Sequence, residues 1–219
     1  MKILDVPRSG SYQGITSSRN RFGQYVRTRA TPVNPNSSFQ GAVRARLAAN
    51  AAAWRDLSDL QRDGWLSLGL MMARTDSLGQ SYDLTGFQAY VSVNNNLTAA
   101  GEATVDDAPA LSTPEALLTA TVTLEDTPTL SIAYTVTPLP ASTKLFVFAS
   151  PQRSQGRSFE NDFRLVFVSA AAAASPANAL AGYVARFGNP VLGNKIFFSL
   201  VTHFGGFTSA PLLTSAVAV

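Results

Sequence analysis

The stretch "TLSIAYTV", Thr129 to Val136, sets the expected fold of the C-terminal half of the chain. Leu130, Ile132, Tyr134 and Val136 face one way along an extended backbone, and the small or polar residues between them face the other way. An apolar residue at every second position is typical of a strand with one buried face. We therefore predict a β-strand here and look for others with the same period.

Six further short segments carry apolar residues at strand spacing, and Pro, Gly and Asn clusters separate them. Many short strands divided by turn signals are typical of a β-sandwich of immunoglobulin or fibronectin type III style. The chain has no cysteine, so a disulfide-stapled antibody-type domain is excluded. The seven predicted strands lie within residues 118–126, 129–138, 143–151, 163–171, 182–188, 194–204 and 212–219.

In the region before these strands, residues 37–98, apolar residues recur with the period of a helix. Ser37 or Ser38 can cap a first helix, on which apolar residues recur at steps of three and four. These face-forming positions are Phe39, Val43, Leu47, Asn50/Ala51 and Trp54.

A second helix is predicted to run to about Ala73. Ser58 and Gln61 fit a capping box at its start, and its inward positions should be Leu60, Trp65, Leu68 and Met72.

The segment "TGFQAYVSVNNNL" predicts a third helix that groups Phe87, Tyr90, Val91 and Asn94. A strand is the alternative, because Val91 and Val93 alternate. We expect four aromatic residues to anchor the helical core, although tryptophans could instead stack on nucleobases. The expected anchors are Trp54, Trp65, Phe39 and Phe87.

Residues 1–36 read as an extended basic arm, with Gly and Pro punctuation and no helical period. No lysine occurs between Lys2 and Lys144. Arginine used alone favours a protein surface, where the planar guanidinium pairs with carboxylates and carbonyls. Phosphate contact by the same arginines, with tyrosine and phenylalanine between them, is the alternative. The predicted interaction residues, for a subunit or for phosphate, are Arg19, Arg21, Tyr25, Arg27, Arg29, Arg44 and Arg46.

Charge is unevenly distributed along the chain. Residues 1–65 carry ten Lys and Arg against four acidic residues, whereas residues 66–219 carry seven against ten. Only 14% of the residues are charged, which suggests that neighbouring subunits cover much of the surface. These features indicate a polyanion partner or a basic arm that docks on an acidic neighbour.

The expected fold class is therefore α+β, with an extended N-terminal arm and a small helical head followed by an all-β sandwich. The expected domains are the arm at 1–36, the helical domain at 37–98 and the sandwich at 119–219. Residues 99–118 are small, acidic and rich in proline, which is linker composition.

Residues that carry chemistry are sparse. The single histidine, His203, stands in a predicted strand without a second histidine nearby, and we expect a structural role for it. No phosphate loop, nucleophile elbow or calcium loop is present. We therefore expect no enzyme activity, no cofactor, no metal and no small-molecule substrate. A signal peptide and a membrane span are also not expected, so synthesis should be cytoplasmic.

The sequence from Ser18 to Trp65, together with Thr85 to Asn94, resembles uncharacterised proteins of bacterial genomes, prophages and environmental phages. The motifs that carry the resemblance cover less than half of the chain. They are Tyr25-Val26-Arg27, Pro32-Val33-Asn34-Pro35, Ser37 to Gln40, Arg44 to Arg46, Trp54 to Leu57 and Gln61 to Trp65. The resemblance implies a virion part and brings no catalytic residues.

We thus expect a non-enzymatic structural protein of a phage virion or phage-like assembly, such as a capsid decoration, tail or fibre component. Its partners would be other virion subunits, including copies of itself, and it would be located in the virion. The alternatives are a nucleic-acid-binding accessory protein and a bacterial surface or filament protein.

Overall fold

The computed structural model describes residues 8–76, 79–125 and 129–218, which fall into two compact units divided between Val43 and Arg44. Four helices and several antiparallel sheets occur in these ranges, so the chain is of mixed α+β class. The first seven residues of the expected arm, Asp126 and Val219 lie outside the described residues.

The first unit contains a small antiparallel sheet in the region where the sequence predicted an extended arm. Its strands, in the order β1-β2-β3, are β1 (Gly10–Tyr12), β2 (Ile15–Asn20) and β3 (Gly23–Thr28). We call these three strands the arm sheet. Residues 29–37 form neither helix nor strand, and α1 (Ser38–Asp56) then begins.

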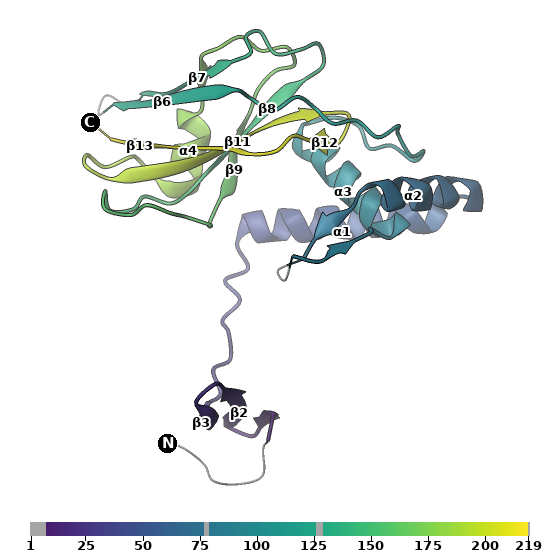
Figure 1. The fold of residues 1–219 in the computed structure, drawn as a ribbon, viewed down its shortest axis with the longest axis vertical. Coiled ribbons are helices and arrows are strands. Elements are labelled where there is room, and N and C mark those ends of the chain that lie inside the picture. Colours follow the sequence, from purple (N-terminus) through teal and green to yellow (C-terminus); the bar gives the residue numbers. More distant parts are fainter. Residues whose placement is uncertain (1–7, 77–78, 126–128, 219) are drawn as a thin grey trace. The chain divides into compact units, whose positions relative to one another are not determined.

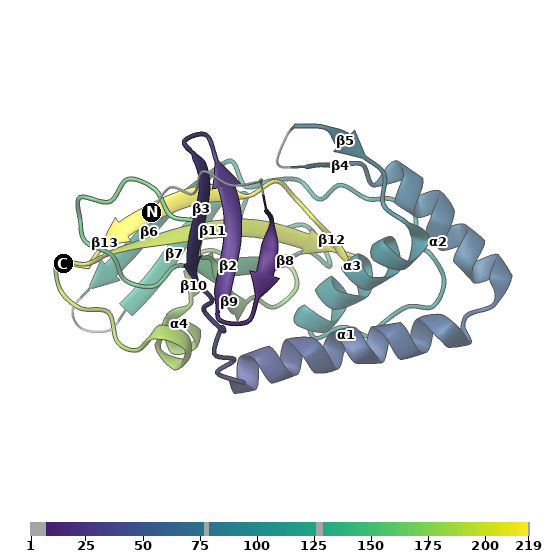
Figure 2. The ribbon, with the colours of Figure 1, turned by 90° about the horizontal axis from the view of Figure 1, so that it is seen from below.

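Two helices of the second unit begin after residues whose side chains satisfy free backbone N–H groups. Capping boxes at Ser58 and Thr85 open α2 (Asp59–Met71) and α3 (Gly86–Ala99), and a short hairpin of β4 (Arg74–Thr75) and β5 (Ser81–Tyr82) lies between them. The segment that begins at Thr85 is therefore a helix, α3, as predicted, and not a strand. Figure 2 shows α2 and α3 side by side.

Two sheets account for the C-terminal half. One has the order β10-β7-β6, and the other has β12-β11-β8-β9 with β13 also paired to β11. Leu130, Ile132 and Tyr134 are buried against Leu145, Ile196 and their neighbours, so the main core lies between the two sheets (Figure 1). The strands are β6 (Thr119–Glu125), β7 (Thr129–Thr135), β8 (Lys144–Ala149), β9 (Arg164–Val168), β10 (Ala177–Asn178), β11 (Lys195–Phe204), β12 (Phe207–Thr208) and β13 (Leu212–Val217).

The strand predicted at 182–188 is wrong, because this segment belongs to helix α4 (Leu180–Phe187). Tyr183 is fully buried, and its ring packs on that of Phe187, one helical turn further, at 5.1 Å between centroids. A segment of only seven residues fits both the strand period and the helix period, so its length could not decide between them. The third strand of the sheet formed by β6 and β7 is the short β10, which pairs with β7.

The expected linker at 99–118 is tied into the fold at several points. The indole nitrogen of Trp65 donates to the carbonyl of Asp106 at 2.7 Å, and the Asn94 side chain pairs with both backbone groups of Val105 at 3.0 and 2.8 Å. At its far end, the Thr202 hydroxyl donates to the carbonyl of Glu115 at 2.7 Å. These bonds make the segment a fixed connection, and helices and sheets share the unit of residues 44–219.

Candidate functional site: the basic arm and its surroundings

The arm sheet has two different faces. Ser17 pairs with Val26 and Tyr12 with Ile15, and the alternation of side chains adds Arg19 to the same face. The opposite face carries Tyr25 and Arg27, which pair with Ser18 and Thr16. The first face carries Tyr12, Ile15 and Val26 among four polar side chains, one of them Arg19, and is therefore the more apolar of the two.

The remaining arm arginines lie at the ends of the strands. Arg21 is in the turn between β2 and β3, and its guanidinium lies 4.6 Å from the centre of the Phe22 ring. Arg29 follows β3, and its backbone N–H donates to the carbonyl of Gly14 at 2.8 Å. The structure thus does not gather Arg19, Arg21, Arg27 and Arg29 on one face, because the hairpin register separates them.

Burial is the most informative property of the arm. None of the residues from 8 to 40 is buried, and Tyr12, Ile15 and Phe22 are exposed. A sheet of three short strands normally needs a packed face to be stable. The arm sheet is therefore a surface with apolar side chains and no core of its own.

Helix α1 begins as predicted but does not bury its first half. Ser37 and Gln40 exchange side-chain to backbone hydrogen bonds at 3.2 and 3.4 Å, which closes a capping box. Phe39 is 47% exposed, and Val43 and Leu47 are also exposed. The core anchor expected at Phe39 is therefore wrong, since the helical period marks an apolar face without showing what covers it. On the same helix, Arg44 is exposed and Arg46 half-buried.

The other aromatic anchors meet around α3. Trp65 is fully buried, and its ring lies 5.1 Å from that of Tyr90. Trp54 is half-buried and packs against Tyr90 and Phe87, with centroid distances of 5.4 and 5.7 Å. Phe87 itself remains at the edge of this cluster, where 36% of it is exposed. Both tryptophans are thus engaged in side-chain packing.

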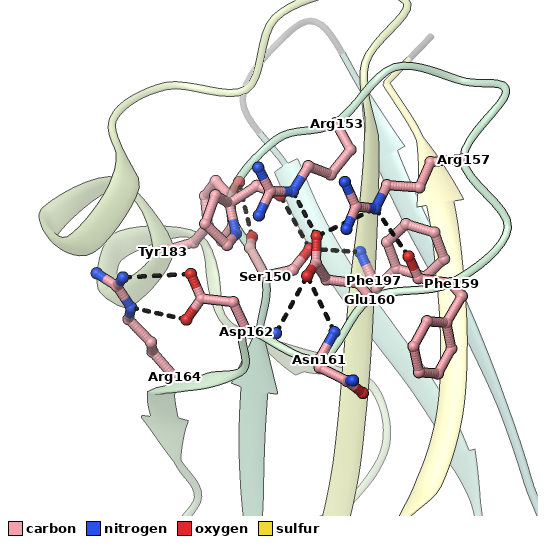
Figure 3. A network of polar contacts seen from close by, with 11 residues as sticks. Ser150, Arg153, Arg157, Phe159, Glu160, Asn161, Asp162, Arg164, Tyr183 and Phe197 are labelled. Atoms are coloured by element: carbon pink, nitrogen blue, oxygen red, sulfur yellow. Dashed lines mark hydrogen bonds and ion pairs between the residues drawn. The ribbon is translucent and has the colours of Figure 1, made fainter. Parts of the chain in front are cut away.

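A buried carboxylate that the sequence did not indicate organises the loop before β9. Glu160 accepts backbone N–H bonds from Asn161 and Asp162 at 2.9 and 3.1 Å, and it forms ion pairs with Arg153 and Arg157 (Figure 3). The N–H of Asp162, with Arg153 and Asn161, holds the pKa of the Glu160 carboxyl at about 2, below its ordinary value of 4.5. The flanking Phe159 and Phe163 and the arginines at steps of three and seven were the available signals.

The hydrogen bonds and ion pairs of Glu160 have a structural role. Both carboxylate oxygens of Glu160 already accept bonds, so the group is ionised and engaged. Nearby, the Ser150 hydroxyl accepts from the N–H of Phe197 at 3.0 Å and donates to the next carbonyl (Figure 3). The arrangement fixes the loop on β11 and leaves no poised general base.

His203 is fully buried in β11 and stacks on Phe146, with 4.8 Å between ring centroids. Its Nε2 accepts the N–H of Gly206 at 3.1 Å, and burial lowers the pKa of the imidazole. The neutral ring therefore holds the turn after β11, which is a structural position. Among the described residues, His, Asp and Glu side chains nowhere form a group of three or more that could hold a metal. None of the described helices combines the length and hydropathy that a bilayer crossing requires.

Comparisons with family models, with curated proteins and with solved structures give no match to this chain.

Proposed function

We propose that this protein is a non-enzymatic structural subunit of a phage virion or phage-like assembly, as a capsid decoration, tail or fibre component. It attaches to neighbouring subunits through the arm sheet and the exposed part of α1. One observation supports this proposal most directly. The arm folds into a sheet, yet none of the residues from 8 to 40 is buried. Such a segment gains stability when a partner covers its apolar face.

The sandwich supports the same proposal at the level of fold. We propose that it belongs to the immunoglobulin and fibronectin type III class, because its first, second and fifth strands pair in one sheet. The third, fourth, sixth and seventh strands form the other sheet, with β12 as a short extension of the β11 hairpin. A compact sandwich of this kind would serve as the outward or lateral module of a subunit.

Self-association of the purified full-length chain tests the proposal. Sedimentation velocity should show species that grow with concentration, and negative-stain microscopy of the largest species should show a regular repeat. Limited proteolysis should cut at the arm, around Arg19 to Arg29, only in the dissociated protein. A strict monomer at high concentration, together with an arm that remains protease-sensitive in the source particles, would refute the proposal.

A second candidate function is nucleic-acid binding. Between Arg8 and Arg55 the chain carries eight arginines and no acidic residue, which would attract a polyanion. Retention on DNA should then decrease steeply with salt and should be lost when Arg19 and Arg27 are replaced by alanine. Absence of retention at low salt would remove this candidate.

A further inference from the structure

The acidic residues that would complement the arm follow it directly in the sequence. Between Asp56 and Asp126 the chain carries eleven acidic residues and only two arginines. The basic segment from Arg8 to Arg55 and this acidic segment are thus opposite in charge on one and the same chain. Opposite patches on identical subunits favour association of one copy with the next.

Helix α2 presents the surface on which that charge combines with exposed apolar area. Its buried side is formed by Trp65, Leu68 and Gly69. Its exposed side combines two carboxylates with four large apolar residues, and we call it the α2 outer face. The members of this face are Asp59, Leu60, Asp63, Leu66, Leu70 and Met71.

This exposure corrects one prediction, since Leu60 was expected to point inward and is 83% exposed. In a helix of 3.6 residues per turn, these six positions fall within less than half of the circumference. The side chain of Asp59 is almost fully exposed, although it pairs with Arg62 at 3.2 Å. A helix with apolar residues on its exposed side and carboxylates among them can receive an apolar partner that carries arginine.

We propose that the more apolar face of the arm sheet of one copy docks on the α2 outer face of a second copy. Tyr12, Ile15 and Val26 would cover the leucines, and Arg19 and Arg21 would pair with Asp59 and Asp63. This inference rests on the proposed assembly role and names its acceptor. The two surfaces match in length, because the six-residue β2 of the arm sheet and the thirteen-residue α2 are both about 20 Å long.

The contact is heterologous, since the arm and the α2 outer face are different surfaces of the same chain. Each copy then offers one arm and one acceptor, so that the association closes into a ring or continues as a filament. A dimer with two-fold symmetry through identical patches is not the expected product.

Charge-reversal variants of the full-length chain test this arrangement. The arm variant carries Arg19→Asp and Arg21→Asp, and the acceptor variant carries Asp59→Arg and Asp63→Arg. Asp83→Arg, before α3 and outside the α2 outer face, is the matched control. Each double variant should associate with itself at least about tenfold more weakly than the wild type, whereas the control should not. Leu60→Arg is a second acceptor variant, chosen because this exposed side chain does not contribute to the core.

The decisive measurement mixes the two double variants at equal concentration. The basic arm of the acceptor variant complements the acidic acceptor of the arm variant, and the reversed arm of the arm variant complements the reversed acceptor of the acceptor variant. Sedimentation should therefore show mixed species, in which the two variants alternate, that neither variant forms alone. Reversing all four charges in one chain should restore self-association.

Three results would overturn the inference, and they separate it from the proposed function. Undiminished assembly of both acceptor variants would place the acceptor elsewhere and leave the assembly role intact. A monomeric wild type would remove both proposals. A monomeric wild type whose arm becomes protease-sensitive on Asp63→Arg would place the arm on its own chain.

Discussion

Phe207→Ala tests whether the helices and the sheets unfold together. Phe207 lies on β12, in the hairpin that follows β11, yet it is only 6% exposed because it packs in the cluster of Trp65, Tyr90 and Val93 from the helices. Removing a buried phenylalanine side chain typically costs about 3–5 kcal/mol. For a unit of this size, that cost corresponds to a decrease in Tm of roughly 6–20 °C.

The chain supplies two independent probes for this test. Both of its tryptophans, Trp54 and Trp65, are in the helical region, so fluorescence follows the helices while far-UV circular dichroism follows helices and sheets together. We expect one coincident transition by both probes, shifted as a whole in urea or on heating. Phe204→Ala is the control, because Phe204 is 39% exposed at the same turn and its loss should cost about 1 kcal/mol or less.

Two separate transitions, with only the fluorescence transition shifted by Phe207→Ala, would refute this reasoning. That outcome would support the predicted division into a helical domain at 37–98 and a sandwich at 119–219. The structural basis for a joint transition is the turn before Phe207, where the Asn96 side chain donates to the carbonyl of Gly206 at 2.8 Å. A Cβ on Gly206 would lie 2.5 Å from a methyl group of Val93, so backbone and helix are in direct contact.

Three further predictions concern the second unit. Because the folded-state pKa of Glu160 is about 2 and its ordinary value is 4.5, the ionised carboxylate stabilises the fold above about pH 4.5, and this contribution is lost as the pH falls toward 2. Glu160→Gln should therefore lower the Tm at pH 7, and its difference from the wild type should shrink between pH 5 and pH 2; an unchanged difference would contradict the assignment. In α4, Gly182→Ala would place a Cβ 1.7 Å from the carbonyl oxygen of Val166 and should cost at least about 1–3 kcal/mol in chemical denaturation. Gly156→Ala meets nothing within 4 Å and is the control, so equal effects of the two alanines would be inconsistent with the close approach. Trp65→Phe removes an indole donor and should cost about 1–3 kcal/mol by urea unfolding, and a neutral effect would show that this hydrogen bond contributes nothing.

The sequence predicted helices and strands correctly where apolar residues followed a single spacing, of a helix or of a strand, over many residues. The alternation of Leu130, Ile132 and Tyr134 gave a strand with those three side chains buried, and Ser58 with Gln61 gave the start of α2. The short segment of α4 was misassigned because its packing depends on a contact with β9, where Gly182 allows close approach. Periodicity contains no information about such tertiary contacts.

The candidate interface was only partly predictable for a similar reason. Tyr25 and Arg27 were expected to be interaction residues, and the structure places both on one face of β3, with Val26 on the other. The position of Arg19 on the other face follows from the register of the hairpin, which a turn at Arg21 determines. The exposure of Leu60 follows from which side of α2 packs on α3, and composition alone does not specify that side.

The irregular stretch between the arm sheet and α1 limits how any assembly of this protein could be spaced. Nine residues, 29–37, separate the end of β3 from the first residue of α1. Fully stretched, they reach about 30 Å, and Pro32 and Pro35 restrict how compactly they can fold back. A connection of that reach keeps the end of β3 within about 30 Å of the first residue of α1. The repeat distance of a ring or filament built by arm exchange would therefore be limited by this connection.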